Sequence, residues 1–153
     1  KVAVSAIKYT ILKQALGGNI IYDEEKSISF EGDSGPYLQY TTVRAGSLLE
    51  KAKVQNIIPS NIVPEGWQTT VIEKLLYRFP EVVLRSHELL EPHHVAVYLT
   101  ELAGSFNSFY GQNQIIDSND LAGTGYKLAL VNAFRTTMIN GLYLLGIEVP
   151  ERM

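Results

Sequence analysis

The carboxyl-terminal end of the chain carries its clearest helical pattern, which reads Lys127-Leu128-Ala129-Leu130-Val131-Asn132-Ala133-Phe134-Arg135 and continues to Gly141-Leu142-Tyr143-Leu144-Leu145-Gly146-Ile147. Apolar residues recur there by threes and fours, which predicts a helix from about Gly125 to Leu145 with one buried face. A glycine inside a helix costs about 1 kcal/mol relative to alanine, so Gly141 indicates a close approach of another backbone or a ligand. We favour close helix packing. The predicted face contains Leu128, Val131, Phe134 or Arg135, Met138, Leu142 and Leu145.

A second long helix is predicted upstream, between Ser34 and about Lys53. Ser34 is suited to be its N-cap, and Pro36 falls in the first turn, where its missing N–H costs nothing. Apolar and small residues recur at helical spacing along this helix and predict a second buried stripe. The stripe contains Leu38, Val43 or Thr42, Ala45, Leu49 and Ala52.

The middle of the chain is also predicted to be helical. The ranges 67–79 and 81–90 make either a helical pair or one helix bent at Pro80, because proline removes a backbone hydrogen bond. Another helix begins at Pro92 and runs through Tyr110, and the ranges 54–66 and 111–121 are predicted loops. The expected fold is all-α, an up-and-down bundle of about four or five helices.

The amino-terminal segment differs from the bundle in pattern. Val2 to Leu16 predicts a short helix, which Gly17-Gly18 interrupts. Asn19 to Phe30 has apolar pairs on both sides of an acidic turn, which predicts a short extended or hairpin segment. The chain begins with Lys1 rather than methionine, so we interpret it as a piece of a longer protein.

Composition limits the function classes. The chain has 153 residues with 46% hydrophobic content, enough for one domain with a core. It contains no cysteine, which excludes disulfides and thiolate chemistry. No apolar run reaches the length of a membrane span and no signal peptide is evident, so we expect a soluble, cytoplasmic protein without a membrane partner.

Charge argues against a general binder of polyanions. The formal net charge is -3 and the isoelectric point is near 5.6, whereas such binders usually carry a basic face and a high isoelectric point. The cations are unevenly placed, however, and this permits a local basic face. They concentrate in the second predicted helix, at Arg44, Lys51 and Lys53, and in or after the last one, at Lys127, Arg135 and Arg152.

The carboxyl-terminal pattern closely resembles the end of arginyl-tRNA synthetases. In that family a long helix with an Asp-Ala-Leu-Arg-like motif leads into Gly-Leu-x-Leu-Leu-Gly and stops at Glu-Arg-Met. Here the motif reads Asn132-Ala133-Phe134-Arg135, so only its alanine and arginine are kept. The resemblance implies that residues 1–34 are the end of the catalytic core or a connector, and that residues 35–153 are a DALR-type anticodon-binding domain.

The same resemblance implies a site for the anticodon at Tyr110. Leu102-Ala103-Gly104-Ser105-Phe106-Asn107-Ser108-Phe109-Tyr110 is similar to the family's helix end of the form Leu-Ala-x-x-Phe-x-x-Phe-Tyr, whose tyrosine lies against the anticodon loop. Aromatic rings hold single-stranded bases by stacking. The alternative is that Tyr110 anchors the helix end in the core.

Tyr40 and Arg44 are the next candidates, because they lie four residues apart and share one helix face. In the family, Tyr-Leu-Gln-Tyr followed by an arginine four residues on faces the same anticodon loop. The ring is suited to stacking on a base, and the guanidinium to holding a phosphate or a base edge. Alternatively, Tyr40 packs in the bundle and Arg44 is a solvated charge.

Three residues near the end of the chain complete the predicted site. Arg135 is the least certain, and we interpret it first as a structural residue that pairs with a buried carboxylate. Arg152 and Met153 belong to the tail that the family pattern places beside the anticodon. There the terminal carboxylate accepts hydrogen bonds from base amino groups, while the thioether packs on a base.

Other motifs are not interpreted as sites. His87, His93 and His94 are expected to be surface or capping residues rather than metal ligands, because adjacent histidines diverge. Gly123-Thr124-Gly125 lacks the rest of a nucleotide-binding motif. We therefore predict no metal and no cofactor site in this chain.

The resemblance also implies the activity of the parent protein. Its catalytic signatures, His-x-Gly-His and Lys-Met-Ser-Lys, are missing here, so this fragment is predicted not to aminoacylate. The parent is expected to be a monomeric arginine-tRNA ligase that uses ATP with Mg²⁺ in an upstream catalytic domain and charges tRNA(Arg). A helical protein-protein interaction module is the alternative function, and low sensitivity of its binding to salt would distinguish it.

Overall fold

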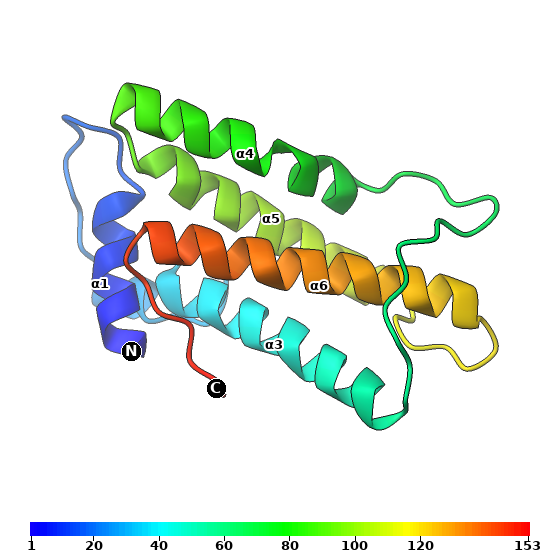
Figure 1. The fold of residues 1–153 in the computed structure, drawn as a ribbon. Coiled ribbons are helices and arrows are strands. Elements are labelled where there is room, and N and C mark those ends of the chain that lie inside the picture. Colours follow the sequence, from blue (N-terminus) through cyan, green and yellow to red (C-terminus); the bar gives the residue numbers. More distant parts are fainter.

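Four long helices lie side by side, and successive ones run in opposite directions (Figure 1). The computed structural model describes residues 1–153 and contains no strand, so the predicted all-α class is confirmed. Helix α3 packs on α6, and α4 packs on α5. The helices are α1 (Val2–Leu12), α2 (Glu24–Ser27), α3 (Gly35–Val54), α4 (Val71–Leu89), α5 (His93–Gln112) and α6 (Leu121–Leu144).

The predicted buried face of α6 is confirmed, with Phe134 rather than Arg135 as its central member. The ring of Phe134 stacks on Phe106 of α5 at a centroid distance of 4.1 Å. Gly141 is buried, and a Cβ built there would lie 2.5 Å from Leu99 Cδ2, so the glycine serves close helix packing as we expected. The helix begins at Leu121, earlier than predicted, because Asp120 accepts a hydrogen bond from the Gly123 N–H and caps it.

Helix α3 follows its prediction closely. The Ser34 side chain accepts a hydrogen bond from the Tyr37 N–H at 3.1 Å, and Pro36 occupies the first turn. Of the predicted stripe, Leu38, Thr42, Ala45 and Ala52 are buried and Leu49 is half-buried.

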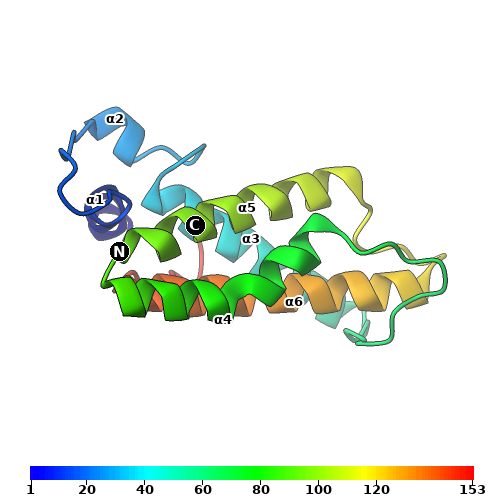
Figure 2. The same ribbon diagram turned by 90° about the horizontal axis from the view of Figure 1, so that it is seen from above.

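Helix α4 is a single helix that contains Pro80, one of the two predicted alternatives. Figure 2 shows that it changes direction in its first half, as the hydrogen bond lost at proline permits. It begins at Val71 rather than Trp67, because Glu73 accepts hydrogen bonds from the Thr70 N–H and hydroxyl in a capping box.

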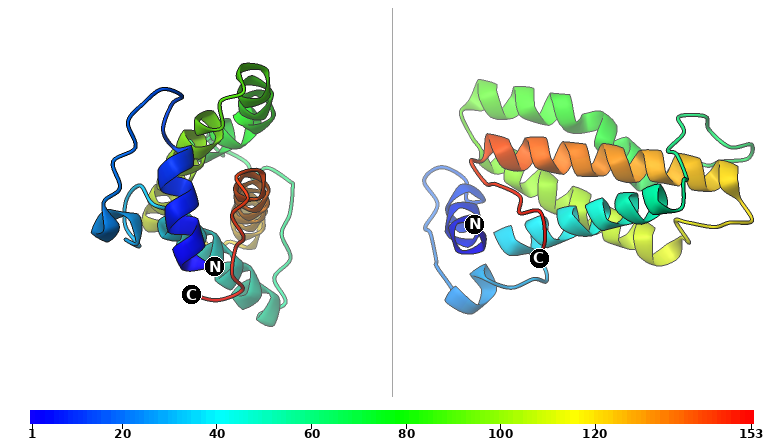
Figure 3. Two further views of the ribbon diagram at one scale, coloured as in Figure 1. Left: turned by 90° about the vertical axis from the view of Figure 1, so that its left-hand side faces the viewer. Right: turned by 60° about the horizontal axis from the view of Figure 1, so that its bottom comes forward.

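The amino-terminal segment crosses one end of the bundle. Helix α1 is seen end-on where the long helices run across the view (Figure 2), and a turned view shows it beside the ends of α3 and α6 (Figure 3). It ends at Leu12 rather than Leu16. The hairpin considered for Asn19 to Phe30 is wrong: Asp23 caps the one-turn helix α2, so the acidic turn is helical.

No helix of the structure is both long enough and apolar enough to cross a bilayer.

Candidate nucleic-acid interface

The guanidinium of Arg44 lies between two tyrosine rings. It is 5.6 Å from the ring centroid of Tyr40, one turn earlier on α3, and 4.8 Å from that of Tyr110, in the last turns of α5. No carboxylate lies within ion-pair distance of Arg44. The rings attract the cation through their faces and hold it in place without neutralising it. The structure therefore brings Tyr110 together with Tyr40 and Arg44, the pair that the sequence predicted on one helix face.

Both rings remain available to a ligand. Tyr40 is 37% exposed and Tyr110 is 36% exposed, whereas Phe106 and Phe109 of α5 are buried. The core-anchor alternative for Tyr110 thus describes its phenylalanine neighbours better than the tyrosine itself. One face of the Tyr110 ring is directed to Phe106, at a centroid distance of 6.3 Å.

Asn107 is a member of this cluster that sequence reasoning missed. Its Nδ2 donates to the hydroxyl of Tyr37 at 2.9 Å, and its Oδ1 lies 3.4 Å from Arg44 Nη1. The two partners are both on α3, so the amide orients the arginine from the opposite helix. The only local indication in the sequence is that Asn107 lies three residues before Tyr110, on the same face of α5.

Phe30 closes the cluster on its other side. Its ring meets Tyr40 edge to face at 6.1 Å and is half exposed. Beside it lies an open hollow of about 380 Å³. The hollow is lined by Phe30, Glu31, Gly32, Tyr37, Tyr40, Arg44 and Asn107.

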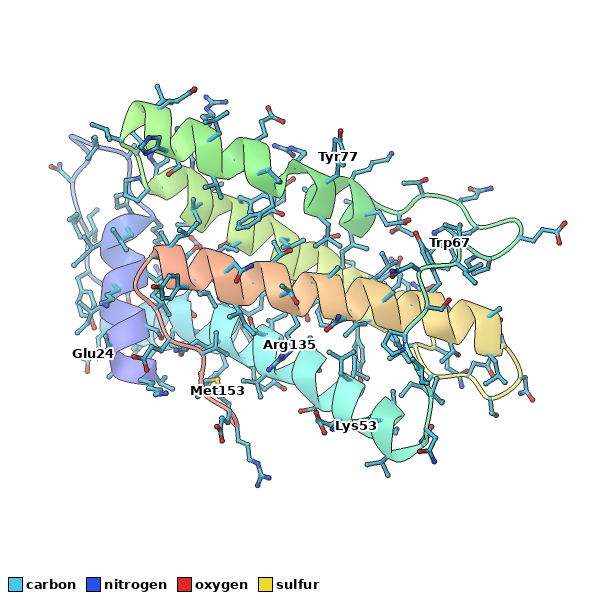
Figure 4. The ribbon with its side chains drawn as sticks, viewed as in Figure 1. Glu24, Lys53, Trp67, Tyr77, Arg135 and Met153 are labelled. Carbon is cyan, nitrogen blue, oxygen red and sulfur yellow. The ribbon has the colours of Figure 1, made fainter.

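A second hollow, of about 610 Å³, lies on the other flank of α3. Arg135 of α6 and Arg152 of the tail both line it, together with the acidic side chains of Glu50 and Glu151. Figure 4 shows Arg135 directed from α6 toward α3. Neither arginine has a carboxylate within ion-pair distance.

The structural interpretation of Arg135 is therefore wrong. Phe134 takes the buried position, which turns Arg135 outward to an exposed position across α3. A Cβ added at Gly46 would lie 3.0 Å from its Nε, so the glycine leaves room for the side chain. No buried carboxylate pairs with Arg135.

Met153 belongs to neither hollow. It is 42% exposed, and it lies near the end of a tail that crosses toward α3 (Figure 4). The tail is fastened upstream by Ile147, which is buried, and by a hydrogen bond from Lys8 to the Gly146 carbonyl. Its free end is on the side of the molecule that bears Arg135 and α3.

Several cations on α3, α6 and the tail have no ion-pair partner. Lys13, Lys26 and Arg78 are paired with carboxylates elsewhere, and Lys1 pairs with Glu148. The chain has a net charge of -3, and the acidic side chains of Glu50 and Glu151 line the same hollow as Arg135 and Arg152. The cations on α3, α6 and the tail without an ion-pair partner are Arg44, Lys51, Lys53, Lys127, Arg135 and Arg152.

The histidines at the start of α5 do not diverge, contrary to our argument from sequence. The rings of His93 and His94 are 4.1 Å apart, because Glu91 Oε2 lies near both, 3.0 Å from His94 Nε2 and 3.9 Å from His93 Nδ1. These three side chains have the types of metal ligands. Arg78 and Arg85 line the same hollow, however, and their charge opposes a cation, as does the helix N-terminus. The lack of a metal site stays a prediction.

Comparison with known proteins places the chain in a family. The model of the DALR anticodon binding domain matches residues 38–153. The chain belongs to this family. The match begins inside α3, and the domain boundary that we placed between residues 34 and 35 stays a prediction.

Relatives of this DALR chain are whole ligases. It is 38% identical to an arginine-tRNA ligase of Exiguobacterium, in a match that covers 99% of this chain and 26% of that protein. It is 37% identical to an arginine-tRNA ligase of Pyrococcus furiosus, in a match that covers 100% of this chain and 25% of that protein. Thermus thermophilus arginyl-tRNA synthetase superimposes with a TM-score of 0.81 at 36% identity, over 99% of this chain and 26% of that one. The chain therefore spans about a quarter of the length of its relatives.

Proposed function

We propose that this chain is the anticodon-binding region of an arginine-tRNA ligase. The observation that carries the proposal is the position of Arg44 between two partly exposed tyrosine rings in a chain of the DALR family. Exposed rings and an unneutralised cation at one hollow are what a single-stranded nucleic acid requires. The ligase part of the proposal comes from the longer relatives of the chain, which are arginine-tRNA ligases.

We propose that the two hollows bind different parts of the RNA, bases near Tyr40 and phosphates near Arg135. The exposed parts of the Tyr40 and Tyr110 rings contact unstacked bases, and each base-aromatic stack contributes about 1 to 3 kcal/mol. Arg44 is held in place before the RNA arrives, so little side-chain entropy is lost on binding. Arg135 and Arg152 in the second hollow contact phosphates, because both are exposed and have no carboxylate partner.

The chain supplies orientation rather than bond chemistry. We propose that it binds tRNA(Arg) and acts with an upstream catalytic domain that uses ATP and Mg²⁺, in a monomeric, cytoplasmic ligase. Holding the anticodon fixes the position of the acceptor end of the tRNA relative to the catalytic domain. This raises the rate of aminoacylation by lowering the entropy cost of bringing the reactants together. The isolated chain is expected not to charge tRNA.

Salt dependence tests the proposal against the protein-interaction alternative. Binding of a fluorescent arginine-tRNA anticodon stem-loop to the purified chain is titrated at 50 and at 200 mM salt. We expect affinity to fall steeply with salt, because cation-phosphate contacts release counterions. Weak or salt-insensitive binding of the RNA by a folded sample would contradict the proposal and favour an apolar groove for a protein partner.

A further inference from the structure

Gln39 belongs to the Tyr37-Leu38-Gln39-Tyr40 motif, but the proposed interface does not use it. It stands between Tyr37 and Tyr40, yet its side chain is fully buried while that of Tyr40 is 37% exposed. Successive residues of a helix point about 100° apart, so the motif presents its rings on one side and Leu38 and Gln39 on the other. A buried amide needs partners for its oxygen and its nitrogen.

The partners of Gln39 come from two distant segments. Its Nε2 donates to the backbone carbonyl of Glu148 at 2.6 Å, and its Oε1 lies 2.8 Å from the hydroxyl of Ser5. The Glu148 carbonyl only accepts hydrogen bonds, so it fixes which way the amide is turned. One side chain thereby joins α1, α3 and the tail that follows α6.

The hydrogen bond to Glu148 is the last polar fastening of the tail. Upstream, Lys8 holds the Gly146 carbonyl and Ile147 is buried. An exposed pair between Lys1 and Glu148 adds little, because such pairs contribute about 0 to 1 kcal/mol. Beyond Glu148 the tail makes no hydrogen bond to the rest of the chain; Val149 packs against the core, and residues 149–152 line the second hollow.

We infer that Gln39 is a positioning residue, which holds the carboxyl-terminal tail so that Arg152 and Met153 lie on the nucleic-acid face. The inference rests on the proposed function. Within the motif, the buried Gln39 holds the tail, while the exposed Tyr40 contacts the ligand. Gln39 itself touches no RNA. Leucine at this position has a similar volume but leaves the Glu148 carbonyl without a donor, which favours release of the tail.

The two methionines of the chain provide a direct measurement. Met138 is fully buried in α6 and reports on the bundle, whereas Met153 reports on the tail. Methyl-labelled methionine therefore gives two NMR signals with separate meanings. In Gln39→Leu, the Met153 signal should narrow and move toward its random-coil position while the Met138 signal stays in place.

Binding supplies the second readout. Gln39→Leu should weaken anticodon stem-loop binding about tenfold, comparable with the loss of one well-placed contact. In a chain that already carries Arg152→Ala and Met153→Ala, the same substitution should cause no further loss, because Gln39 acts only through the tail. A structural role would weaken binding equally in both backgrounds. Gln55→Leu, an exposed change at the end of the same helix, is the matched control.

The outcomes separate the two proposals. If the Met153 signal is unchanged in Gln39→Leu, or the binding losses are additive, the positioning role is wrong. If the parent chain does not bind the RNA, the proposed function fails, while the NMR comparison still decides whether Gln39 holds the tail. Should Gln39→Leu not fold, Gln39→Glu is measured at pH 8, since its carboxylate repels the Glu148 carbonyl and keeps the acceptor for Ser5.

Discussion

The guanidinium of Arg44 lies 4.8 Å from the ring centroid of Tyr110, although the two residues belong to different helices. The contact draws the end of α5 and the first half of α3 into one surface. Tyr110 is exposed and Arg44 is half-buried, and no carboxylate neutralises the positive charge. A surface of this kind suits a ligand that carries both planar rings and negative charge.

Removal of the Tyr110 ring should weaken RNA binding. Tyr110→Ala is expected to lose about 1 to 3 kcal/mol, or about 5- to 150-fold in affinity, because one stacking face is lost and Arg44 is less firmly held. Tyr110→Phe, which keeps the ring, should bind nearly as tightly. Fluorescence anisotropy with the anticodon stem-loop measures both. Tyr77→Ala removes an 89% exposed ring on α4, and a loss there equal to that of Tyr110→Ala would refute a specific stack.

The arginines of the second hollow should control the salt dependence. Arg135→Ala and Arg152→Ala are each expected to lower the slope of log affinity against log salt by about 0.7, the value for one phosphate on a single strand. Anisotropy titrations at four salt concentrations give the slope. Arg85→Ala, on the exposed face of α4, is the control and should leave it unchanged. Unaltered slopes in all three variants would show that no phosphate is held in this hollow.

Sequence alone predicted the long helices because burial follows the helical repeat. Leu128, Val131, Met138 and Leu142 are buried at the predicted spacing, and only the choice between Phe134 and Arg135 needed the structure. The predicted starts of α4 and α6 differ from the observed ones, because side-chain caps such as that of Asp120 determine where a helix begins, and the apolar repeat does not.

The candidate site was predicted in pieces. Tyr40 and Arg44 share a helix face by spacing alone, and a family resemblance supplied Tyr110. Asn107 and Phe30 were missed, since their importance depends on contacts with α3 that arise only when the helices pack. No local pattern encodes which residues of two distant segments meet.

The contact between Gly141 and Leu99 should resist a larger residue. In Gly141→Ala the new Cβ would lie 2.5 Å from Leu99 Cδ2, and overpacking of a core costs about 1 to 3 kcal/mol, which exceeds the gain of about 1 kcal/mol in helix propensity. We expect a net loss of about 1 kcal/mol in the free energy of unfolding, measured by urea denaturation. Leu99→Val in the same chain should recover part of it, and a more stable single variant would contradict close packing.

Asp33 should make stability depend on pH in the acid range. Burial alone would raise the pKa of this carboxyl, but hydrogen bonds from Tyr9 and Lys13 and the charge of Lys13 hold the pKa below its ordinary value. The contribution to folding is therefore present above the unfolded pKa, near 3.9, and is lost as pH falls through the lower folded pKa.

Asp33→Asn isolates this contribution. The variant should lose about 1 kcal/mol of unfolding free energy at pH 7, because Asp33 is partly exposed, and the difference from the parent should shrink below pH 3. Urea denaturation at the two pH values measures the difference. Glu88→Gln, an exposed carboxyl at the end of α4, serves as the control. A deficit that is the same at both pH values would contradict the carboxylate's role.

The central claim is that this chain reads an anticodon, and its most direct test is a comparison of two RNAs. The purified, folded chain is titrated with arginine tRNA and with the same tRNA carrying altered anticodon bases, at low and at moderate salt. We predict tighter binding of the unaltered tRNA at both salt concentrations, with affinity for both RNAs falling as salt rises. Equal affinity for the two RNAs, or no binding of either, would contradict the claim.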